Sequence, residues 1–226
     1  MCGRYSLGKT GEISKRYNVS NYKTLFKPSY NISPGIKAPV IIRQSPNRVV
    51  LMRWGLIPFW AKDISIGYKM INARAEGIEN KPAFRRPLRI SRCLVPSDGF
   101  YEWKRLNLEG KEEKYPWYIG LKDQEIFSFA GLFDKWSDAE GKEIYSYTII
   151  TCEPNDLLEE IHNRMPVILK KEDEDKWLDK FTALNDILKL LKTYPAEDLQ
   201  SYPVSRRVNN PENDDKDLIK PQELNL

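Results

Sequence analysis

The sequence has very few residues that build metal sites or disulfide frameworks. It holds one histidine and three cysteines among 226 residues. Cys2, Cys93 and Cys152 form no C-x-x-C pair, and together with the single histidine they show no zinc-ligand spacing. We therefore expect no metal, no cofactor and no disulfide. Cys93 and Cys152 lie in apolar runs, where a reduced cysteine fills the core.

Long hydrophobic runs, repeats and flexible linkers are also missing. No apolar run reaches the roughly 18 residues that span a bilayer, and charged residues interrupt the N-terminus too early for a secretion signal. We expect a cytoplasmic protein that does not enter a membrane. Because no Gly/Ser linker divides the chain, we expect a single domain over residues 1–210, followed by a loose, polar tail at 211–226.

Strand-like segments dominate the first two thirds of the chain. They are rich in β-branched and aromatic residues and are separated by turn signals. They cover residues 38–44, 48–56, 92–103, 116–121, 126–136, 145–153 and 165–169. Helical patterns are fewer and cover residues 11–19, 154–162 and 172–192. Many strands with a few peripheral helices predict an α+β fold with an antiparallel, barrel-like sheet core.

The modest net charge of +4 conceals two oppositely charged halves. Residues 1–105 contain 20 Lys and Arg against 6 Asp and Glu, whereas residues 106–226 contain 16 against 26. A basic half indicates a polyanionic partner, nucleic acid first. The alternative is that the two halves neutralise each other in the fold.

Four short stretches combine polar groups with glycine, proline and aromatics. They are "MCGR", "NARAE", "DGFYEW" and "IHNRMPV". Glu102 lies between two aromatics, where partial burial would raise its pKa toward that of a general acid. Taken alone, Glu102 could equally face water, His162 could cap a helix end, and Arg74 could pair with Glu76.

Together these stretches resemble the SOS-response-associated peptidase (SRAP) family. "YNISPG", "WGLIP" and "PVSRRVNN" resemble further landmarks of that family, so seven motifs agree in order over about residues 1–210. The resemblance implies a single α+β domain that senses abasic sites in single-stranded DNA and links to them covalently through Cys2. The sequence departs from the family pattern at Ser97 and Gly77, neither of which is a proposed reacting group.

The resemblance implies a role for each candidate residue. Asn72 would hold the terminal cysteine and the opened sugar, Glu102 would act as the acid and base, and His162 would assist Schiff-base formation. Arg74 would bind the phosphate beside the lesion. The other residues expected on DNA are Arg4 and Arg85 for phosphates and Trp54, Pro34 and Phe84 for stacking or wedging.

The position of Cys2 directly behind Met1 fits this chemistry. Removal of Met1 leaves an α-amine and a thiol on one residue, which can close a thiazolidine ring on an aldehyde. An α-amine has a pKa of about 7.7 and a lysine about 10.4, so the α-amine is roughly 500 times more available as free base. The family name implies that Cys2, Asn72, Glu102 and His162 remove Met1 autocatalytically, and a DNA lyase-type activity fits the same site.

Two other functions use the same residues. Cys2, His162 and Asn72 could form a thiol hydrolase that cleaves peptides or amides in trans. Alternatively, Arg74, Arg85, Arg86 and the aromatics could bind single-stranded DNA without a covalent step. We expect a monomer in either case.

Overall fold

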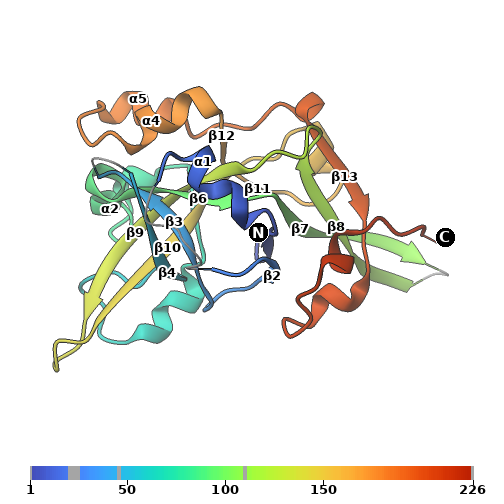
Figure 1. Cartoon of the computed structure of the whole chain (residues 1–226), viewed down its shortest axis with the longest axis horizontal. Helices are drawn as coiled ribbons and strands as arrows, with labels where there is room; N and C mark the ends of the chain where they lie inside the picture. The colour runs from blue at the N-terminus through green and yellow to red at the C-terminus, as the bar shows by residue number, and fades with distance from the viewer. Residues whose placement is uncertain (1, 20–25, 45–46, 109–110, 225–226) are drawn as a thin grey trace.

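The computed structural model describes residues 2–19, 26–44, 47–108 and 111–224, and its strands form two sheets (Figure 1). The strands are β1 (Tyr5–Leu7), β2 (Ser29–Ile32), β3 (Lys37–Ile42), β4 (Arg48–Trp54), β5 (Asn72–Arg74), β6 (Arg92–Ser97), β7 (Gly99–Leu108), β8 (Lys111–Leu121), β9 (Phe127–Ser137), β10 (Glu143–Cys152), β11 (Met165–Pro166), β12 (Ile168–Leu169) and β13 (Leu199–Pro203).

The larger sheet closes into a five-stranded barrel. Its order is β11-β10-β4-β3-β6-β9-β12, and β9 also pairs with β10, which closes the ring. All of these pairings are antiparallel except β4 with β10, and β5 joins β10 as a second parallel pair. The expected α+β fold with a barrel-like core is therefore confirmed, with two parallel pairings added.

The smaller sheet is antiparallel throughout and carries both ends of the chain. Its order is β13-β8-β7-β1-β2, so the short β1 lies between β2 and the long β7–β8 hairpin. Figure 1 shows this hairpin on the right, with the C-terminal segment lying against it. The smaller sheet thus brings the first residues of the chain beside β7.

The helices are short and fall within the three predicted stretches, with one addition, α2. The α-helices are α1 (Ile13–Arg16), α2 (Arg85–Ile90), α3 (Asp156–Glu159), α4 (Glu174–Leu178) and α5 (Leu184–Lys189). The 3₁₀ turns are η1 (Thr10–Glu12), η2 (Ile64–Lys69), η3 (Ile78–Asn80), η4 (Lys171–Asp173), η5 (Ala196–Asp198), η6 (Arg206–Asn209) and η7 (Lys216–Ile219). Among the described residues, none of the helices has the length and apolar character that crossing a bilayer requires.

The predicted strand over 92–103 is in fact two strands in different sheets. The chain leaves the barrel at Asp98, whose buried carboxylate accepts hydrogen bonds from the Ser6 hydroxyl and from the backbone N–H groups of Gly8 and Lys9. Gly99 then begins β7, and a Cβ at Gly99 would overlap the ring of Tyr118. The break at Asp98 and Gly99 turns the next residues toward the smaller sheet.

The expected loose tail is packed against the fold over residues 211–224. Leu218 is fully buried in a second, small apolar cluster with Tyr101 and Tyr118. The backbone N–H of Gln222 donates to the Pro203 carbonyl at 2.9 Å. The polar composition predicted a free segment, but one leucine and the backbone hydrogen bonds are enough to dock it; residues 225–226 lie outside the described part.

Candidate functional site

The first residues of the chain lie along the strand that carries Glu102. The N–H of Tyr101 donates to the Arg4 carbonyl at 3.0 Å, and Tyr5 pairs with Phe100 in antiparallel register. Continuing that register by two residues places Gly3 opposite Glu102. The pairing of β1 with β7 therefore places Cys2 near Glu102. Met1 lies outside the described residues.

Cys2 is fully buried, and its thiol lies 3.9 Å from the Arg4 carbonyl oxygen. Burial raises the pKa of this thiol well above its ordinary value, and the negative charge of Glu102 raises it further. Cys2 is therefore a protonated thiol at neutral pH. A base must take its proton before the sulfur can form a bond.

Glu102 is the buried carboxyl of the site, with 2% of its surface exposed. It shares the inward face of β7 with the buried Phe100, so the alternative in which it faces water is wrong. Burial raises its pKa from 4.5 to about 7. Near neutral pH, Glu102 can therefore both accept and release a proton, which acid–base catalysis requires.

His162 stands at the mouth of the site, just after α3. Its backbone N–H donates to the Leu158 carbonyl at 2.7 Å, and α3 is capped at its N-terminus by Asn155, whose side chain accepts from the Leu158 N–H. The Arg164 N–H donates to Nδ1 of the imidazole at 3.1 Å. Because Nδ1 is an acceptor, the neutral ring carries its proton on Nε2.

Nε2 of His162 faces the carboxyl of Glu102. The distance from Nε2 to Oε2 is 4.0 Å. Burial lowers the pKa of His162, whereas burial raises that of Glu102. The two shifts have the same cause and favour the uncharged form of each group, the protonated carboxyl and the neutral imidazole.

Asn72 carries a buried side-chain amide. It begins β5, which pairs with β10 at Ile149. Within the described part of the chain, neither its Oδ1 nor its Nδ2 has a hydrogen-bond partner, and both atoms are buried. Leaving such an amide unsatisfied costs about 1–3 kcal/mol, and a ligand that accepts and donates there would recover that cost.

Glu102 and His162 line one open pocket of about 710 Å³. The other lining residues are Trp103, Arg105, Lys114, Glu159, Glu160, Ile161 and Asn163. No group of three or more His, Cys, Asp or Glu suited to a metal occurs within the described ranges. The pocket thus offers two groups for proton transfer, whereas Cys2 and Asn72 are not among its lining residues.

Arg164 connects the loop that carries His162 to two other segments. Its guanidinium forms two hydrogen bonds to Glu76, at 2.8 and 2.9 Å, and a third to the Thr151 carbonyl at 2.6 Å. Arg74 lies close to Glu76 in sequence and was a possible partner, but Glu76 pairs with Arg164 instead. One side chain therefore ties the His162 loop to β10 and to the segment that follows Asn72.

Comparison with known proteins identifies the relatives of this fold and site. The family model described as SOS response associated peptidase (SRAP) matches residues 1–211. The chain belongs to the SRAP family. The match ends one residue beyond the domain limit expected from the sequence.

Named relatives of this SRAP chain are called abasic site processing proteins. YoqW of Bacillus subtilis is 47% identical over 225 residues, covering 97% of this chain and 99% of that protein. HMCES of Rattus norvegicus is 33% identical over 236 residues, covering 87% and 66%. A crystal structure of a Bacteroides thetaiotaomicron protein matches with a TM-score of 0.89 and 32% identity, covering 98% of this chain and all of that one.

The three arginines expected on DNA differ in their surroundings in this SRAP chain. Arg74 and Arg85 are exposed, and neither forms an ion pair within the described residues. Arg4 is partly buried, and its Nη1 donates to Asn31 Oδ1 at 2.6 Å and to the Val208 carbonyl at 2.7 Å. Arg74 and Arg85 are thus free to meet phosphates, whereas Arg4 already serves the fold with one nitrogen.

The expected stacking role of Trp54 does not fit its position. Trp54 has no exposed surface, its ring stacks on Tyr147, and its Nε1 donates to the Ile71 carbonyl next to Asn72. Its bond to Ile71 instead holds the start of β5. Phe84 is 8% exposed and Pro34 is half-buried, so both offer little surface for stacking.

Two aromatic side chains missed in the sequence lie on the surface of the same motif. Phe59 and Trp60 are 54% and 48% exposed, and the Arg86 guanidinium lies 4.8 Å from the centre of the Phe59 ring. Both follow "WGLIP" directly. The tryptophan of the motif was recognisable from the sequence, but which of its aromatics face solvent depends on packing against Tyr5 and Tyr147.

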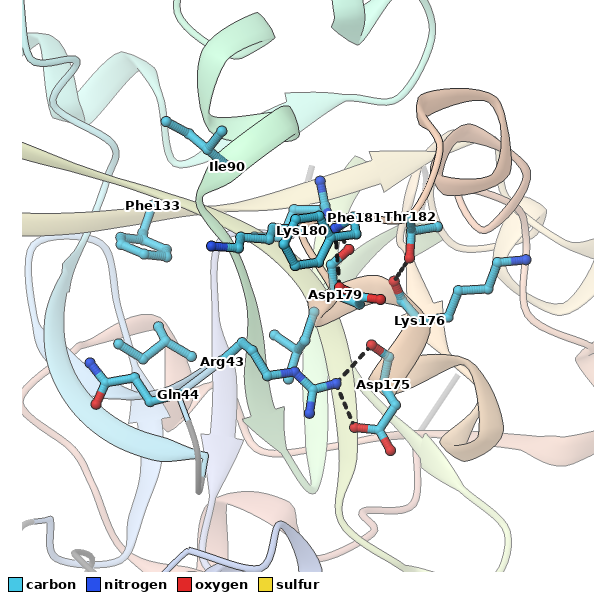
Figure 2. A pocket seen from close by; sticks show the side chains of 13 residues that line it. Arg43, Gln44, Ile90, Phe133, Asp175, Lys176, Asp179, Lys180, Phe181 and Thr182 are labelled. Carbon is cyan, nitrogen blue, oxygen red and sulfur yellow. Dashed lines mark hydrogen bonds and ion pairs between the residues drawn. The ribbon is translucent and has the colours of Figure 1, made fainter.

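Another pocket, of about 1030 Å³, is lined by none of these residues. Figure 2 shows Arg43 bound to the backbone and carboxylate of Asp175 at its edge. Arg92 lines it but donates to four backbone carbonyls where α2 and α4 end, those of Leu88, Arg89, Trp177 and Asp179. The Arg92 guanidinium thus caps the C-terminal ends of both helices. None of the predicted site residues lines this pocket.

Proposed function

We propose that the chain captures abasic sites in single-stranded DNA as a covalent thiazolidine on Cys2, after removal of Met1. The observation that supports this most is Glu102, a buried carboxyl with a pKa of about 7 between the terminal strand and His162. The names of the relatives support the choice of lesion. The net charge of +14 over residues 1–105 supports a DNA partner.

The reaction needs two bond-forming steps and releases one water. The free amine of Cys2 attacks C1′ of the ring-opened sugar aldehyde, and loss of water gives an imine. The thiol then adds its sulfur to the imine carbon, and its proton moves to the nitrogen. Glu102 first takes a proton from the ammonium and protonates the sugar ring oxygen as the ring opens, while His162 relays protons.

Asn72 and the exposed arginines position the DNA in this proposal. The buried, unsatisfied amide of Asn72 can hydrogen-bond both the terminal cysteine and the opened sugar. Arg74 and Arg85, whose side chains are exposed, would contact phosphates. Phe59 and Trp60 replace Trp54 as the rings on which bases would stack.

The same groups would remove Met1 by hydrolysis. One water cleaves the Met1–Cys2 peptide bond, giving free methionine and a chain that begins with the Cys2 amine. A DNA lyase-type activity follows from the imine: loss of a C2′ proton expels the 3′ phosphate and breaks the strand. The thiazolidine competes with this loss because ring closure removes the imine.

A thiol hydrolase acting in trans fits the site less well. Such enzymes lower the pKa of their cysteine to form a thiolate, whereas burial and Glu102 raise the pKa of Cys2. Cleavage of unrelated peptides without a DNA adduct would favour the hydrolase instead.

The test is a denaturing gel of the purified chain with single-stranded DNA that carries an abasic site. We expect a heat-stable shifted band with the wild type, none with Cys2→Ala, and an undiminished band with the matched control Cys152→Ala. A tetrahydrofuran analogue, which has no aldehyde, should give no band. A heat-stable band that persists in Cys2→Ala would overturn the proposal, and unchanged reversible binding without any band would favour a non-covalent DNA binder.

A further inference from the structure

One buried amide, that of Asn31 on β2, connects the two ends of the chain. Asn31 is 4% exposed. Its Oδ1 accepts from Arg4 Nη1 at 2.6 Å. Its Nδ2 donates to three carbonyls of the C-terminal segment, those of Val208 at 3.3 Å, Asn210 at 3.1 Å and Asn213 at 2.6 Å. A side chain that satisfies four groups at once is not a simple surface contact.

The C-terminal segment that Asn31 holds, residues 204–222, also reaches the strand of Glu102. The Nε1 of Trp103 donates to Asn209 Oδ1 at 2.8 Å. Val204, Val208 and Leu218 are fully buried in the cluster that contains Tyr101. We call residues 204–222 the C-terminal clamp.

The clamp therefore contacts the chain on both sides of the candidate reacting groups. Arg4 is two residues from Cys2, and its Nη1 donates both to Asn31 and to the Val208 carbonyl. Its own carbonyl accepts from the Tyr101 N–H at 3.0 Å, so both the backbone and the side chain of Arg4 are anchored. Trp103 directly follows Glu102 and is held by Asn209.

We propose that Asn31 and the C-terminal clamp position Cys2 for ring closure; this rests on the proposed function. Reacting groups must be held to within a few tenths of an ångström for intramolecular closure to gain its full rate. With Arg4 anchored, the sulfur of Cys2 meets the imine carbon before the imine hydrolyses or eliminates. With Arg4 released, the amine still forms the imine, but the sulfur closes the ring more slowly.

The clamp thus predicts a change in product distribution, not only in rate. A slower ring closure leaves more imine, which borohydride reduces to a stable secondary amine. The same imine loses its C2′ proton and breaks the strand more often. A general loss of stability would instead lower all products and DNA binding together.

The test compares Asn31→Ala and Asn209→Ala with the matched control Gln200→Ala. Gln200 also donates its side-chain amide to a backbone carbonyl, that of Leu121 at 3.0 Å, but far from Arg4 in the sheet order. Each chain receives saturating abasic single-stranded DNA. The heat-stable adduct, the borohydride-dependent adduct and the cleaved strand are measured over time, and affinity is measured with the tetrahydrofuran analogue.

We expect Asn31→Ala to slow the heat-stable adduct by about tenfold and Asn209→Ala by about threefold, from loss of positioning. Both should raise the share of borohydride-dependent adduct and cleaved strand, with affinity within about twofold of wild type. Gln200→Ala should match the wild type. If Asn31→Ala does not fold, Asn209→Ala, which loses one bond at an exposed residue, decides by the same readouts.

An unchanged product distribution in the folded Asn31→Ala and Asn209→Ala variants would overturn the positioning role of the clamp, even if the rate of adduct formation falls in parallel with affinity. An equal change in Gln200→Ala also overturns it. A wild-type chain that forms no heat-stable adduct overturns the proposed function and the clamp together, which separates the two failures.

Discussion

Glu102 shows how one buried position creates chemistry. The strand pattern gives the carboxyl an inward direction, beside Phe100, and its removal from water raises its pKa to about 7. An exposed glutamate would be ionised at neutral pH and would not protonate a sugar oxygen. Burial also favours the uncharged forms of the Cys2 thiol and the His162 imidazole.

The pKa of Glu102 makes stability depend on pH. Between pH 4.5 and about 7 the unfolded chain has released this proton while the folded chain keeps it. The folded state then binds more protons, so the free energy of unfolding falls as pH rises through this range. Glu102→Gln removes that slope and should stabilise the chain above pH 7 by on the order of 3 kcal/mol at most.

Urea unfolding of wild type and Glu102→Gln at about pH 4 and about pH 8 measures this difference. The variant should gain stability at the higher pH and show no comparable gain at the lower one. An equal gain at both values would mean that the carboxyl is not kept protonated by the fold.

Glu102→Gln should also slow crosslinking by about 10²- to 10⁴-fold, the usual contribution of a general acid or base. The exposed Glu197 provides a control in Glu197→Gln, which should keep the wild-type rate. Single-turnover gels at neutral pH give both rates. A change below about threefold in Glu102→Gln would remove this carboxyl from the mechanism.

At the scale of elements, the break between β6 and β7 places the site. β6 belongs to the barrel and β7 to the smaller sheet, and the two strands are separated by Asp98. The hydroxyl of Tyr118 is bonded to Ser6 and to the Asp98 carbonyl, so its ring cannot move away from Gly99. The turn therefore requires a residue without a side chain where β7 begins.

Gly99→Ala should lower the free energy of unfolding by about 1–3 kcal/mol or more, because the added methyl overlaps the Tyr118 ring. Gly11→Ala is the matched control, since nothing lies within 4 Å of a Cβ there. It should stay within about 1 kcal/mol of wild type. Urea unfolding decides, and equal stability of the two variants would contradict this account of the turn.

The sequence predicted the elements better than their connections. Runs rich in β-branched residues located the strands, yet the run over 92–103 reads as continuous because Asp98 and Gly99 act through tertiary contacts to Ser6 and Tyr118. The partner of Glu76 is similar: Arg164 is 88 residues away in sequence, whereas Arg74 is close. Local patterns cannot reveal such pairings.

The site residues were predictable because short motifs carry them. Cys2, Asn72, Glu102 and His162 each lie in a motif that a sequence displays directly. The sequence of a motif does not show which of its side chains are buried. Trp54 is in the core, while Phe59 and Trp60 are on the surface. Asn31 was not predicted because its C-terminal partners lie 177 to 182 residues away in sequence.

At the scale of the whole molecule, the basic half of the chain should produce salt-dependent DNA binding. Each phosphate contact releases counterions, so the logarithm of affinity falls linearly with that of salt concentration. Arg74→Ala should reduce this slope by about one, as expected for one lost phosphate contact. Lys189→Ala is the control, because Lys189 is exposed on α5 and paired with Asp186.

Fluorescence anisotropy of the tetrahydrofuran DNA at several salt concentrations gives both slopes. The Lys189 variant should keep the wild-type slope. Equal slopes for wild type and Arg74→Ala would exclude Arg74 from the phosphate contacts.

The most direct test of the covalent mechanism is the intact mass of the chain before and after reaction with abasic single-stranded DNA. Before reaction, the mass should equal that of the sequence without Met1. Afterwards it should equal the sum of protein and DNA less one water, with the DNA remnant on the N-terminal peptide. A chain that still begins with Met1, or an adduct on any other residue, would contradict the mechanism.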